Sequence, residues 1–272
     1  MISDIDLIDV KSLNKVINET YSVDFSDYAT TSFKRRVEKA GNSLHIPTFE
    51  VLLEKIKTDT NFYERFVSNL VVDTTEFFRD PSFWRKLREE VIVKFRANNT
   101  IRIWVAGCSS GEELLSLAIL LKEEGLYDKS KILATEINEF ALMKIKSAVY
   151  DAKSLETAES NYERYEGKHK FSDYYTEING EITMKLDLLT NVNFQAKHLD
   201  DSNIPGKYDL ILCRNVLIYF NPALQDRVIG NFSNSLFPSG YLAIGVKESI
   251  SNSRKGNEFV VVSQEENIYK KK

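Results

Sequence analysis

The sequence has few of the residues that build metal and disulfide sites. Only two cysteines, Cys108 and Cys213, and three histidines occur in 272 residues. No CxxC pair or Cys/His cluster with zinc-ligand spacing is present, so we expect no metal site. Two lone thiols in apolar surroundings instead favour a reducing compartment, where cysteines serve as small buried side chains.

Long apolar runs and an excess of positive charge are also missing. No apolar run reaches the roughly 18 residues of a membrane span. The acidic N-terminus, MISDIDLIDVK, lacks a signal-peptide layout. The formal net charge of −4 argues against general nucleic-acid binding. We therefore expect a cytoplasmic protein that binds no nucleic acid and does not insert into a membrane.

The chain changes character along its length. Up to about residue 75, apolar residues recur at helical spacing, as in DVKSLNKVINETY, and no strand is predicted. From about residue 100, apolar strands alternate with helices, which indicates a mostly parallel sheet with helices on both faces. We predict a helical N-terminal domain over residues 1–75 and an α/β domain over residues 76–272.

Residues 151–191 interrupt this alternation. The segment is polar and contains EINGEITMKL, in which Asn179-Gly180 is a strong hairpin signal. We expect a small β-subdomain inserted into the α/β domain. Near the C-terminus, EFVVVS and NIYK predict a closing hairpin, whereas the final YKKK is expected to fray.

A glycine turn between a strand and a helix is the first candidate site. In VAGCSSGEELLSLAI, small residues from Gly107 to Gly111 let a ligand approach the backbone. Glu112 and Glu113 then open the helix and would repel a phosphate, which disfavours a pyrophosphate-binding loop or a P-loop. Two interpretations remain open, because the acids suit a cationic ligand but also complement the helix dipole.

Glu136 ends the second strand, in ATEIN. In nucleotide-binding α/β folds an acid at this place can hold ribose hydroxyls. The alternative is a surface acid near a helix start that Asn138 caps. Together with a turn that lacks phosphate chemistry, Glu136 favours a nucleoside ligand with a positive charge. S-adenosylmethionine (SAM) has these features: a ribose, an adenine, a sulfonium and an ammonium, without phosphate.

A third strand, DLILC, leads directly into Arg214 and Asn215. Ligands of open α/β sheets sit at the carboxyl edge of the strands. The residues alone leave two interpretations open. One is a strand-to-helix turn with an incidental polar pair. The other is a cofactor cleft lined by both side chains, with Tyr219 pointing into the same cleft one helical turn later.

Four stretches occur in a characteristic order: TTEFFRDPSFW, AGCSSGEELLSLA, ATEIN and DLILCRNVLIYFN. With them, nearly the whole chain resembles the CheR-type chemotaxis receptor methyltransferases, which are SAM-dependent protein-glutamate O-methyltransferases. The resemblance implies a Rossmann-like methyltransferase sheet with an inserted β-subdomain, preceded by a small all-helical domain. It also implies SAM as cofactor, S-adenosylhomocysteine as its product, and the cytoplasmic domain of chemoreceptors as protein substrate. We expect a monomer.

The resemblance assigns site residues by motif. Arg79 and Tyr219 match the pair implicated at the catalytic centre, Glu113 the residue that holds the methionine end, and Glu136 the ribose-binding acid. The positions matched to cofactor binding are Asp73, Thr75, Arg79, Glu113, Glu136, His198, Leu199, Arg214 and Asn215.

Several positions depart from the family pattern. Asp73 and His198 stand where Asn is usual, and Glu136 stands where Asp is common. GEELLS also lacks the proline and aromatic that commonly follow the two acids. These departures leave an alternative open: a diverged paralogue that binds SAM but methylates another signalling protein or acts as a non-catalytic interaction module.

A basic run lies in the helical region, within TTSFKRRVEKAG. It brings Lys34, Arg35, Arg36 and Lys39 close together. Such a face either docks an acidic receptor bundle, as the resemblance implies, or is simply solvated.

Overall fold

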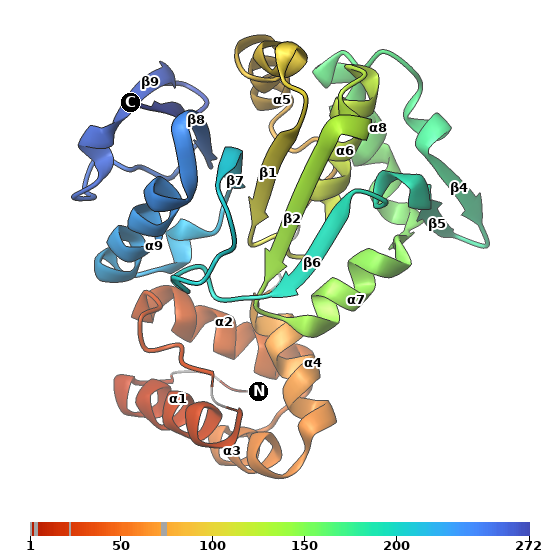
Figure 1. Cartoon of the computed structure of the whole chain (residues 1–272). Helices are drawn as coiled ribbons and strands as arrows, with labels where there is room; N and C mark the ends of the chain where they lie inside the picture. Colours follow the sequence, from red (N-terminus) through yellow and green to blue (C-terminus); the bar gives the residue numbers. More distant parts are fainter. Residues whose placement is uncertain (1, 3–4, 22, 72–74) are drawn as a thin grey trace. The chain divides into compact units, whose positions relative to one another are not determined.

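The computed structural model describes residues 2, 5–21, 23–71 and 75–272 (Figure 1). The chain forms two compact units. Unit 1 comprises Met1–Asp73 and Ile218–Gln225, and unit 2 comprises Thr74–Leu217 and Asp226–Lys272. Among the residues described, no helix has the length and apolarity needed to cross a bilayer.

Unit 1 is helical, as the apolar spacing predicts. Its helices are α1 (Leu7–Tyr21), α2 (Thr30–Ser43), α3 (Phe49–Thr58) and α4 (Thr60–Val71). Each helix buries one face, and Leu13, Phe33, Leu52 and Phe66 meet in a shared core. The hydroxyl of Thr48 caps α3 by accepting a hydrogen bond from the backbone N–H of Val51. The core and the caps together explain why these short helices are stable, since helices of this length are marginal alone.

Unit 2 is built on a seven-stranded sheet with the order β6-β2-β1-β7-β8-β10-β9 (Figure 1). The strands from β6 to β8 are parallel, whereas β10 and β9 are antiparallel to their neighbours. The strands are β1 (Ile101–Ala106), β2 (Ser130–Glu136), β6 (Val192–Ala196), β7 (Tyr208–Cys213), β8 (Leu236–Ile244), β9 (Phe259–Ser263) and β10 (Ile268–Lys271). The predicted mostly parallel sheet is thereby confirmed.

Helices pack on both faces of this sheet, because successive side chains of a strand point in opposite directions. On β1, Trp104 packs against Phe232, while Ile103 and Val105 join the leucines of α6 in the main core. The helices are α5 (Pro81–Glu90), α6 (Glu112–Glu123), α7 (Glu139–Ser147), α8 (Leu155–Tyr165) and α9 (Pro222–Ser235). Short 3₁₀ turns are η1 (Ile92–Ala97), η2 (Tyr127–Lys129), η3 (Ala152–Ser154), η4 (Phe171–Tyr174), η5 (Leu186–Leu188), η6 (Leu217–Tyr219) and η7 (Gly256–Glu258).

The C-terminal hairpin forms as expected, but the expectation that YKKK frays is wrong. Tyr269 and Lys270 pair with β8 on one side and with β9 on the other. Two ladders of backbone hydrogen bonds and the burial of Ile268 hold the end of the chain in the sheet. The NIYK stretch predicts this strand through Lys270, whereas the expected fraying rested on the run of lysines alone.

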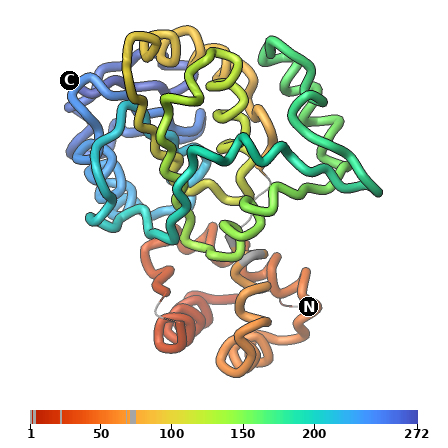
Figure 2. The backbone as a smooth tube through the Cα atoms, turned by 45° about the vertical axis from the view of Figure 1, so that its right-hand side comes forward, coloured from red at the N-terminus to blue at the C-terminus, as the bar shows by residue number. Residues whose placement is uncertain are grey.

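The insert carries a separate three-stranded antiparallel sheet with the order β3-β5-β4. Its strands are β3 (Val149–Asp151), β4 (Tyr175–Ile178) and β5 (Glu181–Met184). Asn179 and Gly180 both have positive φ, 54° and 81°, as the predicted tight hairpin requires. The hairpin projects away from the large sheet (Figures 1 and 2). Helix α8 within the insert was not predicted.

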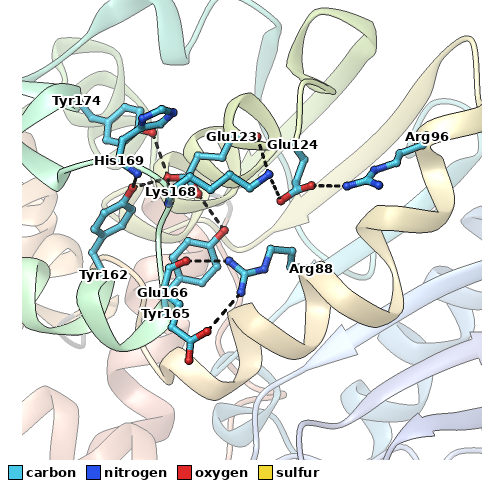
Figure 3. Close-up of polar contacts among 10 residues, drawn as sticks. All are labelled: Arg88, Arg96, Glu123, Glu124, Tyr162, Tyr165, Glu166, Lys168, His169 and Tyr174. Carbon is cyan, nitrogen blue, oxygen red and sulfur yellow. Dashed lines mark hydrogen bonds and ion pairs between the residues drawn. The ribbon is translucent and has the colours of Figure 1, made fainter.

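Glu123, the last residue of α6, ties the insert to the large sheet (Figure 3). Its carboxylate accepts hydrogen bonds from the hydroxyls of Tyr162, Tyr165 and Tyr174. Burial, together with the charge of Glu123, raises the pKa of all three tyrosines, so they remain protonated donors. The neighbouring Glu124 binds Lys168 and Arg96 from opposite sides, at 2.8 and 2.9 Å.

Candidate active site

The glycine turn after β1 adopts a conformation that few other residues tolerate. Gly107 and Gly111 have φ of 77° and 96°. A Cβ on Gly107 would lie 3.0 Å from Cγ2 of Val216, and one on Gly111 would lie 2.7 Å from Cγ1 of Ile145. The N–H of Gly107 donates to the carbonyl of Thr135 at 2.8 Å, which fixes the turn beside the end of β2. The turn therefore needs glycine, because neighbouring side chains pack closely against it at the carboxyl edge of the sheet.

Glu136 is buried at the end of β2, with 4% of its surface exposed, so it is not a surface acid. Its carboxylate accepts backbone N–H bonds from Ser109 at 3.0 Å, from Ile137 at 2.9 Å and from Asn138 at 3.2 Å. Burial raises the pKa of Glu136, and these three hydrogen bonds oppose the rise. These three bonds fix the carboxylate and leave about one of its roughly four acceptor sites for a ribose hydroxyl.

Glu112 and Glu113 open α6 but serve different contacts. Glu112 is buried and accepts hydrogen bonds from the hydroxyl of Ser110, at 2.6 Å, and from the side chain of Thr75. Glu113 pairs instead with Arg214, its Oε2 lying 3.1 Å from Nη1. Burial raises the pKa of both acids, while Arg214 opposes the rise at Glu113. Both make specific side-chain contacts beyond any effect on the helix dipole.

Arg214 connects three parts of the site. Its side chain, 1% exposed, pairs through Nη2 with Asp80 at 2.7 Å and through Nη1 with Glu113. The guanidinium carbon lies 3.8 Å from the ring centroid of Phe83, which covers one of its faces. A lone buried charge would cost several kcal/mol, so the guanidinium and its two acids depend on one another. Arg214 is therefore not an incidental polar residue of a turn.

The loop that precedes α5 carries Thr75 and Arg79, and the core holds it in place. The N–H of Phe78 donates to the hydroxyl of Ser116 at 2.8 Å, and the indole N–H of Trp84 donates to the carbonyl of Arg79 at 3.0 Å. Phe78 and Asp80 have positive φ, 49° and 54°. The partly buried Arg79 side chain lies close enough to Glu113 for its positive charge to oppose the rise in the pKa of that acid.

Sequence reasoning missed two acids of the site, namely Asp80, which pairs with Arg214, and Glu248. Glu248 follows β8, is 6% exposed, and accepts hydrogen bonds from the backbone N–H groups of Asn215, at 3.0 Å, and Gly245. Asn215 has a φ of 60°, and a Cβ on Gly245 would lie 2.8 Å from the backbone nitrogen of Asn215. The side chain of Asn267 donates to the carbonyls of Gly245 and Glu248, both at 2.9 Å. The sequence contains a signal for Glu248, because it follows a parallel strand, and the same pattern is the reason for predicting Glu136.

His198 and Leu199 follow β6. The preceding residue, Lys197, donates its N–H to the carbonyl of Glu136 at 3.1 Å, so this segment lies beside the end of β2. Leu199 is buried, and its carbonyl accepts a hydrogen bond from Asn231 at 3.3 Å. The His198 side chain is exposed.

Unit 2 thus carries most of the predicted residues at the end of β2, just after β6 and β7, at the start of α6 and on the loop before α5. Asp73 lies outside the described residues. Tyr219 belongs to unit 1, where its ring packs against Arg36. That Tyr219 points into the cleft of Arg214 and Asn215 stays a prediction.

The two cysteines are buried in this region, and burial raises the pKa of both thiols, which keeps them protonated core side chains. In the described part of the chain, no group of three or more His, Cys, Asp or Glu side chains is arranged to hold a metal ion.

The hydrogen-bond acceptors of the site fit SAM. Buried acids end or follow three strands, and Glu113 and Asp80 already take up the charge of Arg214. A ligand with hydroxyls and positive charge matches these acceptors, whereas a phosphate would meet repulsion.

Comparison with known proteins agrees with this fit. The family model described as "CheR methyltransferase, SAM binding domain" matches residues 73–267, and "CheR methyltransferase, all-alpha domain" matches residues 8–71. The chain belongs to the CheR methyltransferase family. Its fold class and its cofactor, both predicted from the sequence, are confirmed by this match.

Relatives within the CheR family cover most of the chain. A Pseudomonas putida protein named "Putative methyltransferase Cher3" is 37% identical over 264 residues, 97% of each chain. Proteins named "Chemotaxis protein methyltransferase" are 33% identical over 192 residues in Vibrio parahaemolyticus (68% of each chain) and 28% identical over 240 residues in Listeria monocytogenes (88% of each chain).

We predict that Glu248→Gln weakens SAM binding about tenfold, because a neutral amide oxygen accepts the backbone N–H bonds of Asn215 and Gly245 more weakly than a carboxylate does. Titration calorimetry measures the change. The matched control is Glu265→Gln, at an exposed acid of the same unit. A dissociation constant for Glu248→Gln within twofold of the control would show that Glu248 does not support the site.

We also predict that SAM affinity falls on acidification at a pH above the ordinary pKa of a glutamate side chain, because burial raises the pKa of Glu113 and Glu136. An acid whose pKa is raised by folding binds protons more tightly in the folded state, so unliganded unit 2 becomes less stable as pH rises through the raised pKa. Calorimetry between pH 4 and pH 8 measures the affinity for SAM, and urea unfolding over the same range measures the free energy of unfolding without SAM. Affinity that stays constant down to pH 4.5 would contradict the assignment.

Proposed function

We propose that the protein transfers the methyl group of SAM to glutamate side chains of chemoreceptors and forms glutamyl methyl esters in sensory adaptation. The acceptor is the cytoplasmic domain of the receptor, so the protein acts in the cytoplasm, as a monomer. The observation that carries the proposal is the fixed position of Arg79, whose loop is bound to the core by Ser116 and Trp84. The relatives named as chemotaxis methyltransferases support the choice of substrate.

The chemistry places few demands on the protein. When bound, SAM supplies a methyl group activated by its sulfonium charge and leaves as S-adenosylhomocysteine. A glutamate has an unperturbed pKa of about 4.3, so at neutral pH it is already a nucleophile and needs no general base. What remains for the protein is to position the acceptor and exclude water. Arg79 would orient the acceptor carboxylate through charge-assisted hydrogen bonds, and the Tyr219 hydroxyl would hold the reacting geometry.

The remaining site residues would hold the cofactor. In this proposal Glu113 binds the methionine end, Glu136 the ribose, and His198 and Leu199 the adenine. Asp73, Thr75, Arg214 and Asn215 complete the binding set together with Arg79. We also propose the domain limits that the sequence indicates: a helical domain over residues 1–75 and a methyltransferase domain over residues 76–272, with the insert at about 151–191.

One observation favours a second candidate function. The carboxylate of Glu136 already accepts three backbone N–H bonds, so it has little capacity left for both ribose hydroxyls. Weakened ribose binding would suit a diverged paralogue that methylates another signalling protein or acts as a non-catalytic interaction module. The substitutions at 73 and 198 point the same way.

The test is transfer of label from methyl-labelled SAM to a membrane fraction rich in receptors from the same cell. We expect base-labile label on a receptor-sized band, which identifies a glutamyl ester. We further expect Arg79→Lys to lower turnover about 100-fold at saturating SAM, because a lysine cannot form bidentate hydrogen bonds to a carboxylate.

The control for this variant is Arg254→Lys, which makes the same change at an exposed arginine of unit 2. Label on a different protein would support the redirected substrate. SAM binding without transfer to any protein would support the non-catalytic module. Unchanged turnover in Arg79→Lys would remove Arg79 from the catalytic centre.

A further inference from the structure

Arg36 does not belong to an exposed basic face, although the sequence groups it with Lys34, Arg35 and Lys39. It is 6% exposed, whereas Arg35 and Lys39 are exposed. Its Nη1 donates to the carbonyl of Leu70 at 2.7 Å. Its guanidinium carbon lies 3.5 Å from the centroid of the Tyr219 ring. One side chain of α2 thus contacts both the end of α4 and the residue proposed to act with Arg79.

The backbone around Tyr219 is held by the same unit. The carbonyl of Tyr219 accepts a hydrogen bond from the N–H of Ala29 at 2.8 Å, and the N–H of Asn221 donates to the carbonyl of Asp27 at 2.8 Å. Phe220 packs edge-on against the ring of Tyr28, with centroids 5.3 Å apart. These contacts fix the main chain on both sides of Tyr219.

The side chain of Tyr219 still has two rotatable bonds, and a flat cation on one face of its ring restricts both. A centroid distance of 3.5 Å is direct stacking contact, well inside the roughly 6 Å limit of cation–π interactions. An arginine suits this place better than a lysine, because its planar group covers the ring while an in-plane N–H reaches the Leu70 carbonyl.

We propose that Arg36 is a positioning residue for methyl transfer: its stacked guanidinium fixes the Tyr219 ring and thereby the direction of the tyrosine hydroxyl. The inference rests on the proposed function, in which Tyr219 acts at the reacting centre. It assigns Arg36 a role within unit 1 that differs from docking a receptor. Any docking face on α2 then consists of Lys34, Arg35 and Lys39.

The first experiment measures the kinetics of Arg36→Lys in the full chain with receptor-rich membranes. We expect kcat to fall about tenfold, because the hydroxyl is no longer held in one orientation. The KM for receptor and the dissociation constant for SAM should stay within twofold. Arg65→Lys, at an exposed arginine of α4 in the same unit, makes the same chemical change without a stacked ring and should leave kcat unchanged.

The second experiment combines Arg36→Lys with Tyr219→Phe, which removes the hydroxyl and keeps the ring. Tyr219→Phe alone should lower kcat, and adding Arg36→Lys should cause little further loss, because no hydroxyl is left to orient. If Arg36→Lys melts well below the control, Arg36→Gln serves instead. We expect its shorter planar amide to cover part of the ring, so its kcat should lie between those of wild type and Tyr219→Phe.

The outcomes separate the inference from the function on which it rests. Normal kcat in Tyr219→Phe would refute the catalytic role of the tyrosine and the inference with it. A low kcat in Tyr219→Phe with normal kcat in Arg36→Lys would overturn the inference alone. A raised receptor KM at constant kcat in Arg36→Lys would assign Arg36 to docking, and fully additive losses in the double variant would show that it acts apart from Tyr219.

Discussion

The buried guanidinium of Arg214 is the contact on which the rest of the site depends. It lies where β7 ends, and it binds an acid from the loop before α5 and another from the start of α6. Three segments far apart in the sequence therefore meet at one charge. Removing Arg214 would leave Glu113 buried without its cation, and breaking a buried pair in this way typically costs about 3–5 kcal/mol. The two ion pairs fix the geometry of this network, because the buried guanidinium would not be stable there without its acids.

Buried carboxylates also hold the main chain at the ends of neighbouring strands. Glu136 binds backbone N–H groups at the end of β2, and Glu248 does so at the end of β8. Each carboxylate holds a stretch of main chain in a left-handed or sharply turned conformation. The resulting edge is anionic and rigid, and these two properties suit a cationic nucleoside better than a phosphate.

Much of this was predictable. Strand and helix periods gave the architecture, and acids at the ends of parallel strands gave the cofactor class, because both follow from local patterns. What could not be predicted depends on tertiary partners. Arg36 looks like its basic neighbours until Tyr219, far along the chain, covers it. Glu123 looks like a helix-end acid until three tyrosines of the insert bind it. The lysines at the C-terminus form a strand only because two other strands flank them.

The central claim is that Arg214 builds the SAM site by holding Asp80 and Glu113, and calorimetric titration of SAM into Arg214→Lys tests it most directly. A lysine keeps the charge but cannot bind both acids through a rigid fork, so the dissociation constant should rise at least about tenfold while the fold is retained. Arg227→Lys, at a half-exposed pair with Asp200, provides the control. Affinity for SAM in Arg214→Lys equal to that of this control would contradict the account.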